Sequence, residues 1–423
     1  MRKLTSLLVF AIIGGFVLFS SCNDDDDSPA ADRPTVSAPS NNIVVLAGED
    51  TEVTFGVQIP GGFKSSAVTA VGGTAVVTTD LTTGATSGNV VVTFTAGNSA
   101  GAATVTLTVT DNLDQTDDAV APITVQEEET EVRITENIEE DATWTADKTW
   151  ILGGRITVLD GVTLTIEPGT VIKGEAGAAQ NATALLVARG GMLMAEGTAE
   201  APIIFTSIAD EITPEDVAAG NFESPNLDPD VNGLWGGVII LGKARISATN
   251  DVGDDVIEQQ IEGIPTSDPN GLYGGTDDAD NSGVISYISI RHGGTNIGSG
   301  NEINGLTLGG VGSGTSISNV EIVANQDDGI EWFGGTVSIE GALVWNCGDD
   351  AIDTDQAWAG SVSNFLVVNP GDRAFELDGP EGSLTTDNHQ IHNGSFSGPR
   401  RSDNCGDLTG WKDKRYITND VNF

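Results

Sequence analysis

The chain has 423 residues, with 18 Lys and Arg against 62 Asp and Glu, which gives a formal net charge of −44. Because so acidic a surface repels phosphate backbones, nucleic acid is excluded as a partner, and cations are the natural counterpart. The chain is too long for one ordinary domain, so two or three are expected. Its three His and three Cys show no spacing typical of a zinc site or a catalytic nucleophile.

Residues 1–21 have the pattern of a secretory signal peptide. A basic start precedes an apolar run over residues 7–19, and two serines then stand before Cys22. The run is nearly long enough to span a bilayer, but small residues directly before a cysteine favour cleavage. Residues 18–22, Leu-Phe-Ser-Ser-Cys, resemble the bacterial lipobox, in which the cysteine thiol receives diacylglycerol. The resemblance implies a membrane anchor through lipid on Cys22.

An acidic stretch follows the predicted lipidation site. Residues 23–28 read Asn-Asp-Asp-Asp-Asp-Ser and resemble the export signal of Bacteroidetes lipoproteins that reach the outer face of the cell. The resemblance implies an outer-membrane protein that faces the exterior. The alternative is a solvated acidic linker, and residues 22–33 are in either case predicted to form a tether.

Residues 34–127 are predicted to fold as an immunoglobulin-like β-sandwich. Short runs rich in β-branched residues alternate with Gly, Ser and Asn, which is typical of strands joined by turns. The runs are 42–46, 51–57, 75–78, 89–94, 104–109 and 121–125. The last two resemble the final hairpin of cadherin-like and PKD modules, which implies a spacer.

After a predicted linker over residues 128–139, residues 140–423 indicate a parallel β-helix. The segments 326–331, 348–353 and 371–376 superimpose with a period of about 22 or 23 residues, the length of one coil. Asn346, Asn369 and Asn393 form a ladder of similar spacing. The region has room for about ten to twelve coils and one short helix at 214–219. No polar cap is evident before Phe423, which is the pattern expected of a truncated solenoid.

Several motifs resemble one family. They are 232–242 (NGLWGGVIILG), 261–265 (IEGIP), 290–294 (IRHGG), 301–315 and 327–335 (DDGIEWFGG). Over about residues 130–423 they resemble the right-handed parallel β-helix lipoproteins of marine and gut Bacteroidetes, whose fold is of the pectin-lyase type and whose activity is not established. The resemblance implies a fold and a location, and no reaction.

The repeated acids form the first candidate site. Adjacent coils lie about 4.8 Å apart, so Asp327, Asp349 and Asp372 would form a like-charge column. A column of this kind suits a bound calcium ion, whose ligands are oxygens. The alternative is that these acids cap tight turns by accepting backbone N–H groups.

Two other segments have alternating oxygen-bearing residues before a glycine, which is how a calcium loop begins. They offer Asp228, Asp230 and Asn232, and Asp278, Asp280 and Ser282. Neither has Glu at the twelfth position, so complete EF-hand loops are excluded, and ordinary turns are the alternative.

A catalytic interpretation rests on Asp328, Asp349, Asp350 and Arg373. Polygalacturonases resemble this chain in placing acids one coil apart, although their Gly-His-Gly and Arg-Ile-Lys elements have no counterpart here. Arg373 could serve a calcium-dependent lyase as a base, and the alternative is a salt bridge to Asp350 or Asp372.

Trp332, Trp345 and Trp358 are candidate platforms for sugar rings, with a structural role as the alternative. For Cys347 we expect a small buried side chain, although a disulfide with Cys405 is permitted in an oxidising compartment.

Three functions remain open. The leading hypothesis is a non-catalytic surface protein that binds an extended ligand, a glycan, with calcium as a candidate cofactor. The others are a polysaccharide lyase or glycoside hydrolase, and a structural or adhesive protein. An outer-membrane receptor is a further candidate partner.

Overall fold

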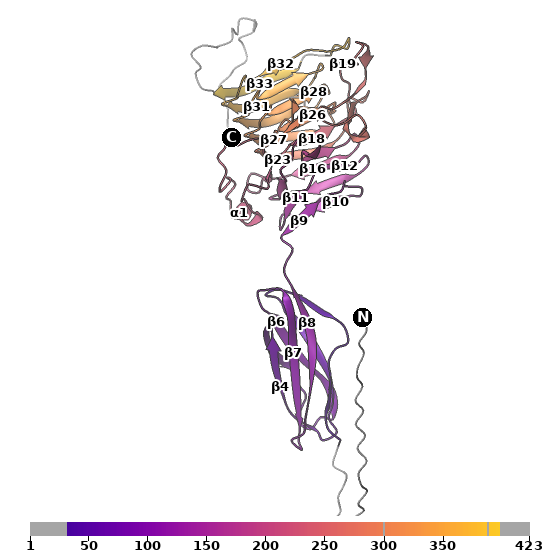
Figure 1. Cartoon of the computed structure of the whole chain (residues 1–423), viewed down its shortest axis with the longest axis vertical. Helices are drawn as coiled ribbons and strands as arrows, with labels where there is room; N and C mark the ends of the chain where they lie inside the picture. The colour runs from indigo at the N-terminus through magenta and orange to yellow at the C-terminus, as the bar shows by residue number, and fades with distance from the viewer. Residues whose placement is uncertain (1–31, 299–300, 387–388, 398–423) are drawn as a thin grey trace, which may run out of the picture. The chain divides into compact units, whose positions relative to one another are not determined.

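The computed structural model describes residues 32–298, 301–386 and 389–397. The predicted signal peptide, Cys22, nearly all of the tether, and Cys405 lie outside these residues. The chain divides into two compact units, one ending at Glu128 and the other beginning at Glu129 (Figure 1). Within the described ranges no helix has the length and apolar character needed to cross a membrane.

The first unit consists of two four-stranded sheets around one core. One sheet has the order β1 (Thr35–Ser37), β3 (Asp50–Gln58), β6 (Ser87–Ala96), β5 (Gly73–Thr79), and the other has the order β2 (Ile43–Leu46), β8 (Thr116–Gln126), β7 (Gly101–Asp111), β4 (Phe63–Val71). Alternate residues point inward, as Val90, Val92 and Phe94 of β6 show with no exposed surface. β4 is not among the predicted strands, because Ser and Ala replace β-branched residues in it.

The second unit is a parallel β-helix, and its strands form two long sheets. The first sheet contains β9 (Glu131–Ile134), β10 (Ala142–Trp144), β11 (Thr149–Leu152), β13 (Thr163–Ile166), β14 (Val171–Gly174), β16 (Met192–Glu196), β17 (Ile203–Ser207), β23 (Gly283–Arg291), β27 (Ser316–Val323), β29 (Ile339–Trp345), β31 (Ser361–Val368) and β33 (Gln390–Ser397). The second sheet has the order β12 (Arg155–Val158), β15 (Ala184–Val187), β18 (Val238–Leu241), β26 (Leu306–Gly309), β28 (Ile330–Phe333), β30 (Ile352–Asp355), β32 (Glu376–Leu377). Every pairing within these two sheets is parallel (Figure 1).

The register confirms the predicted repeat. Glu331 pairs with Asp353, and Asp353 pairs with Glu376, so the three repeated segments stack on successive coils. One core runs through the coils and contains Ile330, Trp332 and Ile352. The residues between them in the strands therefore face away from this core.

The long strands of the first sheet bend at a residue with a left-handed backbone. These positions are Tyr287, Asn319, Gly341, Asn364 and Asn393, and the register aligns them in one column. Asn and Gly tolerate this conformation best.

The predicted ladder of Asn346, Asn369 and Asn393 is therefore wrong in its last member. Asn346 and Asn369 do stack, with the Asn369 side-chain amide donating to Asn346 Oδ1 at 2.7 Å, at the ends of β29 and β31. Asn393 instead aligns with Asn364 in the middle of the strands. The reason is that the coil from β31 to β33 has more residues than the coil from β29 to β31.

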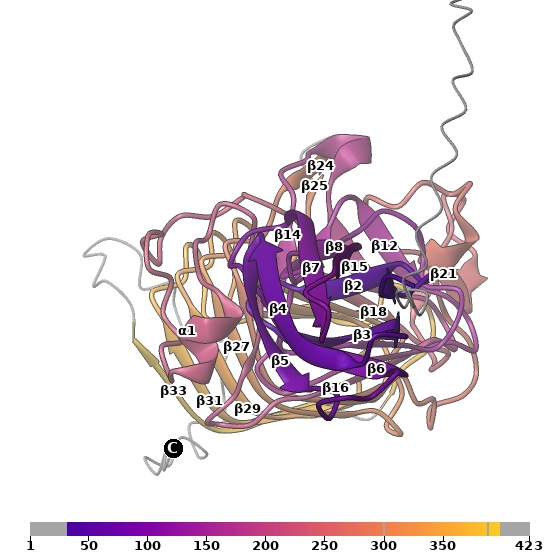
Figure 2. The ribbon, with the colours of Figure 1, turned by 90° about the horizontal axis from the view of Figure 1, so that it is seen from below.

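The second sheet has seven strands in the described part, fewer than the predicted ten to twelve coils. The difference arises because three insertions leave the coils. One, over 208–237, contains α1 (Pro214–Ala218), whose Val217 packs on Val171 and Ile204 outside the first sheet (Figure 2). The helix begins at Thr213, whose side chain caps it together with Asp216.

The other two insertions, over residues 242–282 and 292–305, precede and follow β23 in the chain and lie beside the second sheet. They contain three hairpins, β19 (Ala248–Thr249) with β20 (Asp255–Val256), β21 (Glu258–Gln260) with β22 (Leu272–Gly274), and β24 (Asn296–Gly298) with β25 (Asn301–Glu302). The turns η1 (Ala179–Asn181) and η2 (Pro269–Gly271) complete the described elements. Ile261 and Tyr273 of the insertion before β23 pack with Leu186 and Ile239, which face outward from the second sheet. On β28, β30 and β32 the outward positions become mostly acidic.

Candidate functional site

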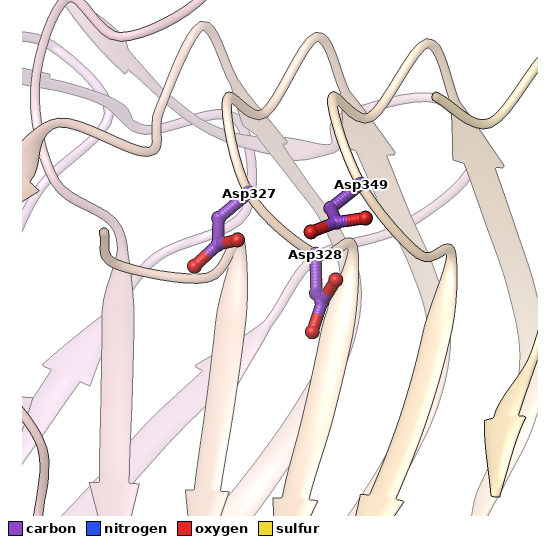
Figure 3. Close-up of side chains that lie close together, drawn as sticks. All are labelled: Asp327, Asp328 and Asp349. Atoms are coloured by element: carbon purple, nitrogen blue, oxygen red, sulfur yellow. The ribbon is translucent and has the colours of Figure 1, made fainter. Parts of the chain in front are cut away.

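Three successive coils carry an acid-bearing turn just before the strands β28, β30 and β32. The turns hold Asp327 and Asp328, Asp349 and Asp350, and Asp372 and Arg373. Figure 3 shows Asp327 and Asp328 on one turn and Asp349 on the next. One carboxylate oxygen of each of these three lies within 4.8 Å of the others, and Asp349, Asp350 and Asp372 form a second such group. The structure thus brings the predicted acids of neighbouring coils together.

The inner acid of each pair supports the next coil. Asp328 Oδ1 accepts a hydrogen bond from the Asp350 backbone N–H at 2.8 Å, and Asp350 Oδ1 accepts one from the Arg373 N–H at 2.6 Å. Both carboxyl groups are buried. Asp328 and Asp350 therefore act as turn caps between coils, a role that the sequence had offered for their neighbours in the column of Asp327, Asp349 and Asp372.

Arg373 forms the salt bridges expected from the sequence. Its Nη1 lies 3.2 Å from Asp350, 3.2 Å from Asp372 and 3.1 Å from Glu376. The negative charges of Asp350, Asp372 and Glu376 raise the pKa of Arg373 above its ordinary value. A guanidinium held this firmly in its charged form is not suited to accept a proton, so these contacts oppose a role for Arg373 as a base.

The outward positions on β28 and β30, and those on and directly after β32, form a surface that we name the acidic face. It consists of Glu331, Asp353, Asp355, Glu376 and Asp378. Glu331, Asp353 and Glu376 are paired across the strands, and Asp378 lies beside Asp355 because its N–H donates to Thr354 O. Two rows of carboxylates therefore run from coil to coil.

Burial and mutual repulsion hold several of these acids in their neutral form. The pKa of Asp328 is raised to about 9 and that of Asp353 to about 8, and burial is the largest cause of both shifts. The pKa of Glu331 lies well above its ordinary value for the same reason, with Asp353 and Asp328 adding repulsion. Burial likewise raises the pKa of Asp355 to about 6 and that of Asp350 to about 7. Burial and repulsion therefore oppose the simultaneous ionisation of these acids, and a bound cation would favour it.

A polar network borders the acidic face. Tyr273 O–H donates to Gln356 Oε1 at 3.1 Å, and Gln356 Nε2 donates to Gln259 at 2.7 Å and to Glu381 at 3.1 Å. Beside it a hollow with room of about 20 Å³, enough for one water-sized occupant, opens next to Glu331. Its lining is Ile239, Ile261, Glu262, Ile297, Ile303, Asn304, Thr307, Asp327, Glu331 and Phe333.

Sequence reasoning missed part of this surface. Asp355 could have been found, because it follows Asp353 by two residues and must share its face of the strand. Asn304, Tyr273 and Glu262 could not, since they come from the insertions, and only the fold brings them beside β28 and β30.

Calcium loops at the two Asp-x-Asp segments stay a prediction, and the structure shows what their acids contact. Asp278 is held by the Arg245 guanidinium, whose Nε lies 2.8 Å from Asp278 Oδ2, and this contact lowers the pKa of Asp278. Asp280 is buried and accepts a hydrogen bond from Ser282 at 3.3 Å. Within the described ranges, neither these residues nor those of the other segment belong to a group of three acids close enough to share an ion.

The segment with Asp228, Asp230 and Asn232 lies elsewhere. Asp230 and Asn232 line a shallow hollow together with Asn346 and Asn369, at the end of the first sheet's strands. The Asn346 side-chain amide donates to Pro229 O at 2.8 Å, so the segment packs against the coil edge as a connection.

Two of the three tryptophans predicted as sugar platforms are in the core, so that prediction is wrong for them. Trp332 has no exposed surface and Trp358 is 2% exposed, and their rings lie 4.7 Å apart. Strand alternation explains the burial, since Glu331 points outward and Trp332 must then point inward. Trp345 is 36% exposed and stays a candidate.

Cys347 is a free cysteine that is buried in the core of the β-helix. Burial raises the pKa of its thiol to about 12, so it stays protonated and acts as a small apolar side chain. Cys405, its predicted candidate partner, lies outside the described residues.

The stacked coils and the outward acids define a parallel β-helix protein with an acidic face. The chain belongs to the family described as the pectate-lyase-like β-helix domain, which matches residues 136–220 and 223–403. No curated protein matches the chain. A solved structure of a family 28 exopolygalacturonase from Yersinia enterocolitica is similar over 87% of this chain and 86% of that one, at 10% identity. The TM-score of this similarity is 0.18.

Proposed function

We propose that this chain is a surface lipoprotein whose β-helix binds an extended glycan along the acidic face. The observation that supports this function best is a row of carboxylates that crosses three coils, with a second row across two of them, beside the Tyr273 and Gln356 network. Strands about 4.8 Å apart offer an equivalent set of acceptors at each step, which suits a polymer more than a small molecule. Carboxylate and amide groups are natural partners for sugar hydroxyls.

The charge of the face narrows the class of glycan. No Lys or Arg is among the residues that form the acidic face or line its hollow in the described part of the chain. In the absence of a bridging cation, such a surface repels polyuronic acids, because their carboxylates would meet like charge. The ligand is therefore a neutral or amine-bearing polysaccharide.

The binding test uses electrophoresis of the full chain through gels that contain a neutral glucan or xylan, chitosan or polygalacturonate. We expect retardation by neutral or amine-bearing glycans and none by polygalacturonate. A Glu376→Gln/Asp378→Asn variant should bind at least about tenfold more weakly, which corresponds to about 1.4 kcal/mol.

The matched control is Glu340→Gln, on β29 of the first sheet, which should bind as the unaltered chain does. Equal binding by the Glu376→Gln/Asp378→Asn variant would remove the acidic face as the binding surface. Retention by polygalacturonate alone would contradict the proposed class of ligand.

Family membership favours a second candidate, a glycoside hydrolase or lyase of the pectate-lyase-like type. The specific observation is a set of adjacent carboxyl groups in different environments, since Asp328 and Asp350 are buried with raised pKa values and Asp349 is exposed. Pairs of this kind supply a proton donor and an acceptor in glycoside hydrolysis. The same glycans, incubated with the protein, should then yield new reducing ends, and Asp349→Asn should abolish them. A binder yields no product at any time.

We infer that the first unit is an immunoglobulin-like spacer behind a lipid on Cys22. Its two packed four-stranded sheets support the spacer, and the lipobox-like sequence supports the lipid. A partner receptor in the outer membrane remains a prediction.

The lipid is tested by growth with labelled palmitate in a bacterium that exports lipoproteins. The chain should take up the label and remain in the membrane fraction, whereas Cys22→Ser should do neither. Labelling of the variant to the same extent would place the anchor elsewhere.

A further inference from the structure

The strongest unexplained feature of the β-helix is a buried group of acids at the boundary between two coils. Asp328 comes from the turn before β28, Glu331 from β28, and Asp353 from β30. One carboxylate oxygen of each lies within 4.8 Å of the others. This group shares only Asp328 with the exposed acids of the turns in Figure 3.

Two buried oxygens at this place have no hydrogen-bond partner. Asp353 is 8% exposed and its Oδ1 accepts no hydrogen bond, and Asn304 is 5% exposed with an unpartnered Oδ1. The other end of the Asn304 amide donates to Glu331, so Asn304 lies at the same group. Buried polar atoms without a partner are rare in folded proteins, and each calls for an explanation such as an ion.

The protein's own donors do not neutralise the group. Arg373, on the turn before β32, forms its salt bridges with Asp350, Asp372 and Glu376 instead. Asp328 receives one backbone N–H, from Asp350, on Oδ1. The group contains three carboxylates and one amide oxygen, and none of its members is a cationic side chain. Oxygen acceptors are therefore in excess of donors.

We propose that Asp328, Glu331 and Asp353 bind a calcium ion between two coils, with Asn304 Oδ1 as a fourth oxygen ligand. Calcium takes about six to eight oxygen ligands in flexible geometry, so the set is completed by carboxylates that bind through both oxygens and by one water in the hollow beside Glu331. Zinc and other softer metals prefer His or Cys, and the group has neither. The ion joins two adjacent coils to the insertion that carries Asn304, so it stabilises the part of the helix that presents the acidic face.

The test is a calcium titration of the full chain in detergent, after removal of divalent ions with EDTA, followed by calorimetry and by thermal melting. One site per chain and a rise in melting temperature are expected. Asp353→Asn, which keeps the shape of the side chain, should weaken calcium binding by at least about tenfold and abolish the rise in melting temperature.

The matched control is Asp355→Asn, on the same strand and the same face but outside the group, which should bind calcium as the unaltered chain does. Glu331→Gln serves as a second variant should Asp353→Asn fail to fold, as judged by circular dichroism. Either an unaltered chain that shows no heat and no shift with millimolar calcium, or variants that bind as well as it does, would overturn the site. Because these measurements contain no glycan, their outcome is independent of the proposed ligand.

Discussion

Replacing Trp332 with alanine is expected to lower the free energy of unfolding of the β-helix by about 3–5 kcal/mol. The side chain has no exposed surface, and its ring packs on Trp358 with centroids 4.7 Å apart. Trp358 in turn donates to Val337 O at 2.9 Å, so the cavity lies within fixed surroundings that cannot collapse. Chemical denaturation followed by circular dichroism measures the loss.

The control for this change is Trp345→Ala, at the exposed end of β29. Trp345 is 36% exposed, so its removal should lower the free energy of unfolding by no more than about 1.5 kcal/mol. A similar loss at both positions would contradict the inward orientation of Trp332. In the glycan gels, Trp345→Ala also tests the one predicted platform that reaches the surface.

Replacing Asp210 with alanine should lower the free energy of unfolding by about 3–5 kcal/mol. Asp210 is 1% exposed, and its carboxylate accepts hydrogen bonds from the Ile212 N–H, Ser224 Oγ and Thr206 Oγ1 at 2.8 to 3.1 Å. Its backbone oxygen also accepts from Lys173 Nζ at 2.6 Å. The substitution leaves buried donors unpaired and removes the nearest negative charge from a buried ammonium.

The measurement is again chemical denaturation, with the exposed neighbour Glu211→Ala as the control, which should change the free energy of unfolding by no more than about 0.5 kcal/mol. A loss at Asp210 as small as that would contradict the importance of its contacts. Replacing Lys173 by Met in the Asp210→Ala background should restore part of the stability, because the buried charge is then gone.

The pH dependence of this pair has a definite sign. Burial lowers the pKa of Lys173 below its ordinary value of 10.5, while Asp210 opposes the shift. Between the folded-state pKa and 10.5 the unfolded chain binds more protons, so this lysine makes the free energy of unfolding rise with pH in that window. Asp210→Ala removes the opposing charge and should extend the window to lower pH.

Local patterns carried the prediction of the β-helix and of its acidic turns. The period of about 22 residues and the β-branched character of the strands can both be recognised from residues close together in the chain. Coils of similar sequence then stack in register. The repeated acids before Ile330, Ile352 and residue 375 therefore had to meet, and the family match confirms a pectate-lyase-like β-helix. The same strand alternation that sends Glu331 outward could have placed Trp332 in the core.

By itself, then, the sequence determined the parallel β-helix and the alignment of its acids from coil to coil, because both depend on a short repeat and on strand geometry. Only the tertiary structure decided how many coils remain after the insertions, and that Asn393 aligns with Asn364. It alone also brought Asn304 to Glu331 and Asp353, because the path of a long insertion is set by packing against distant residues and not by any local pattern.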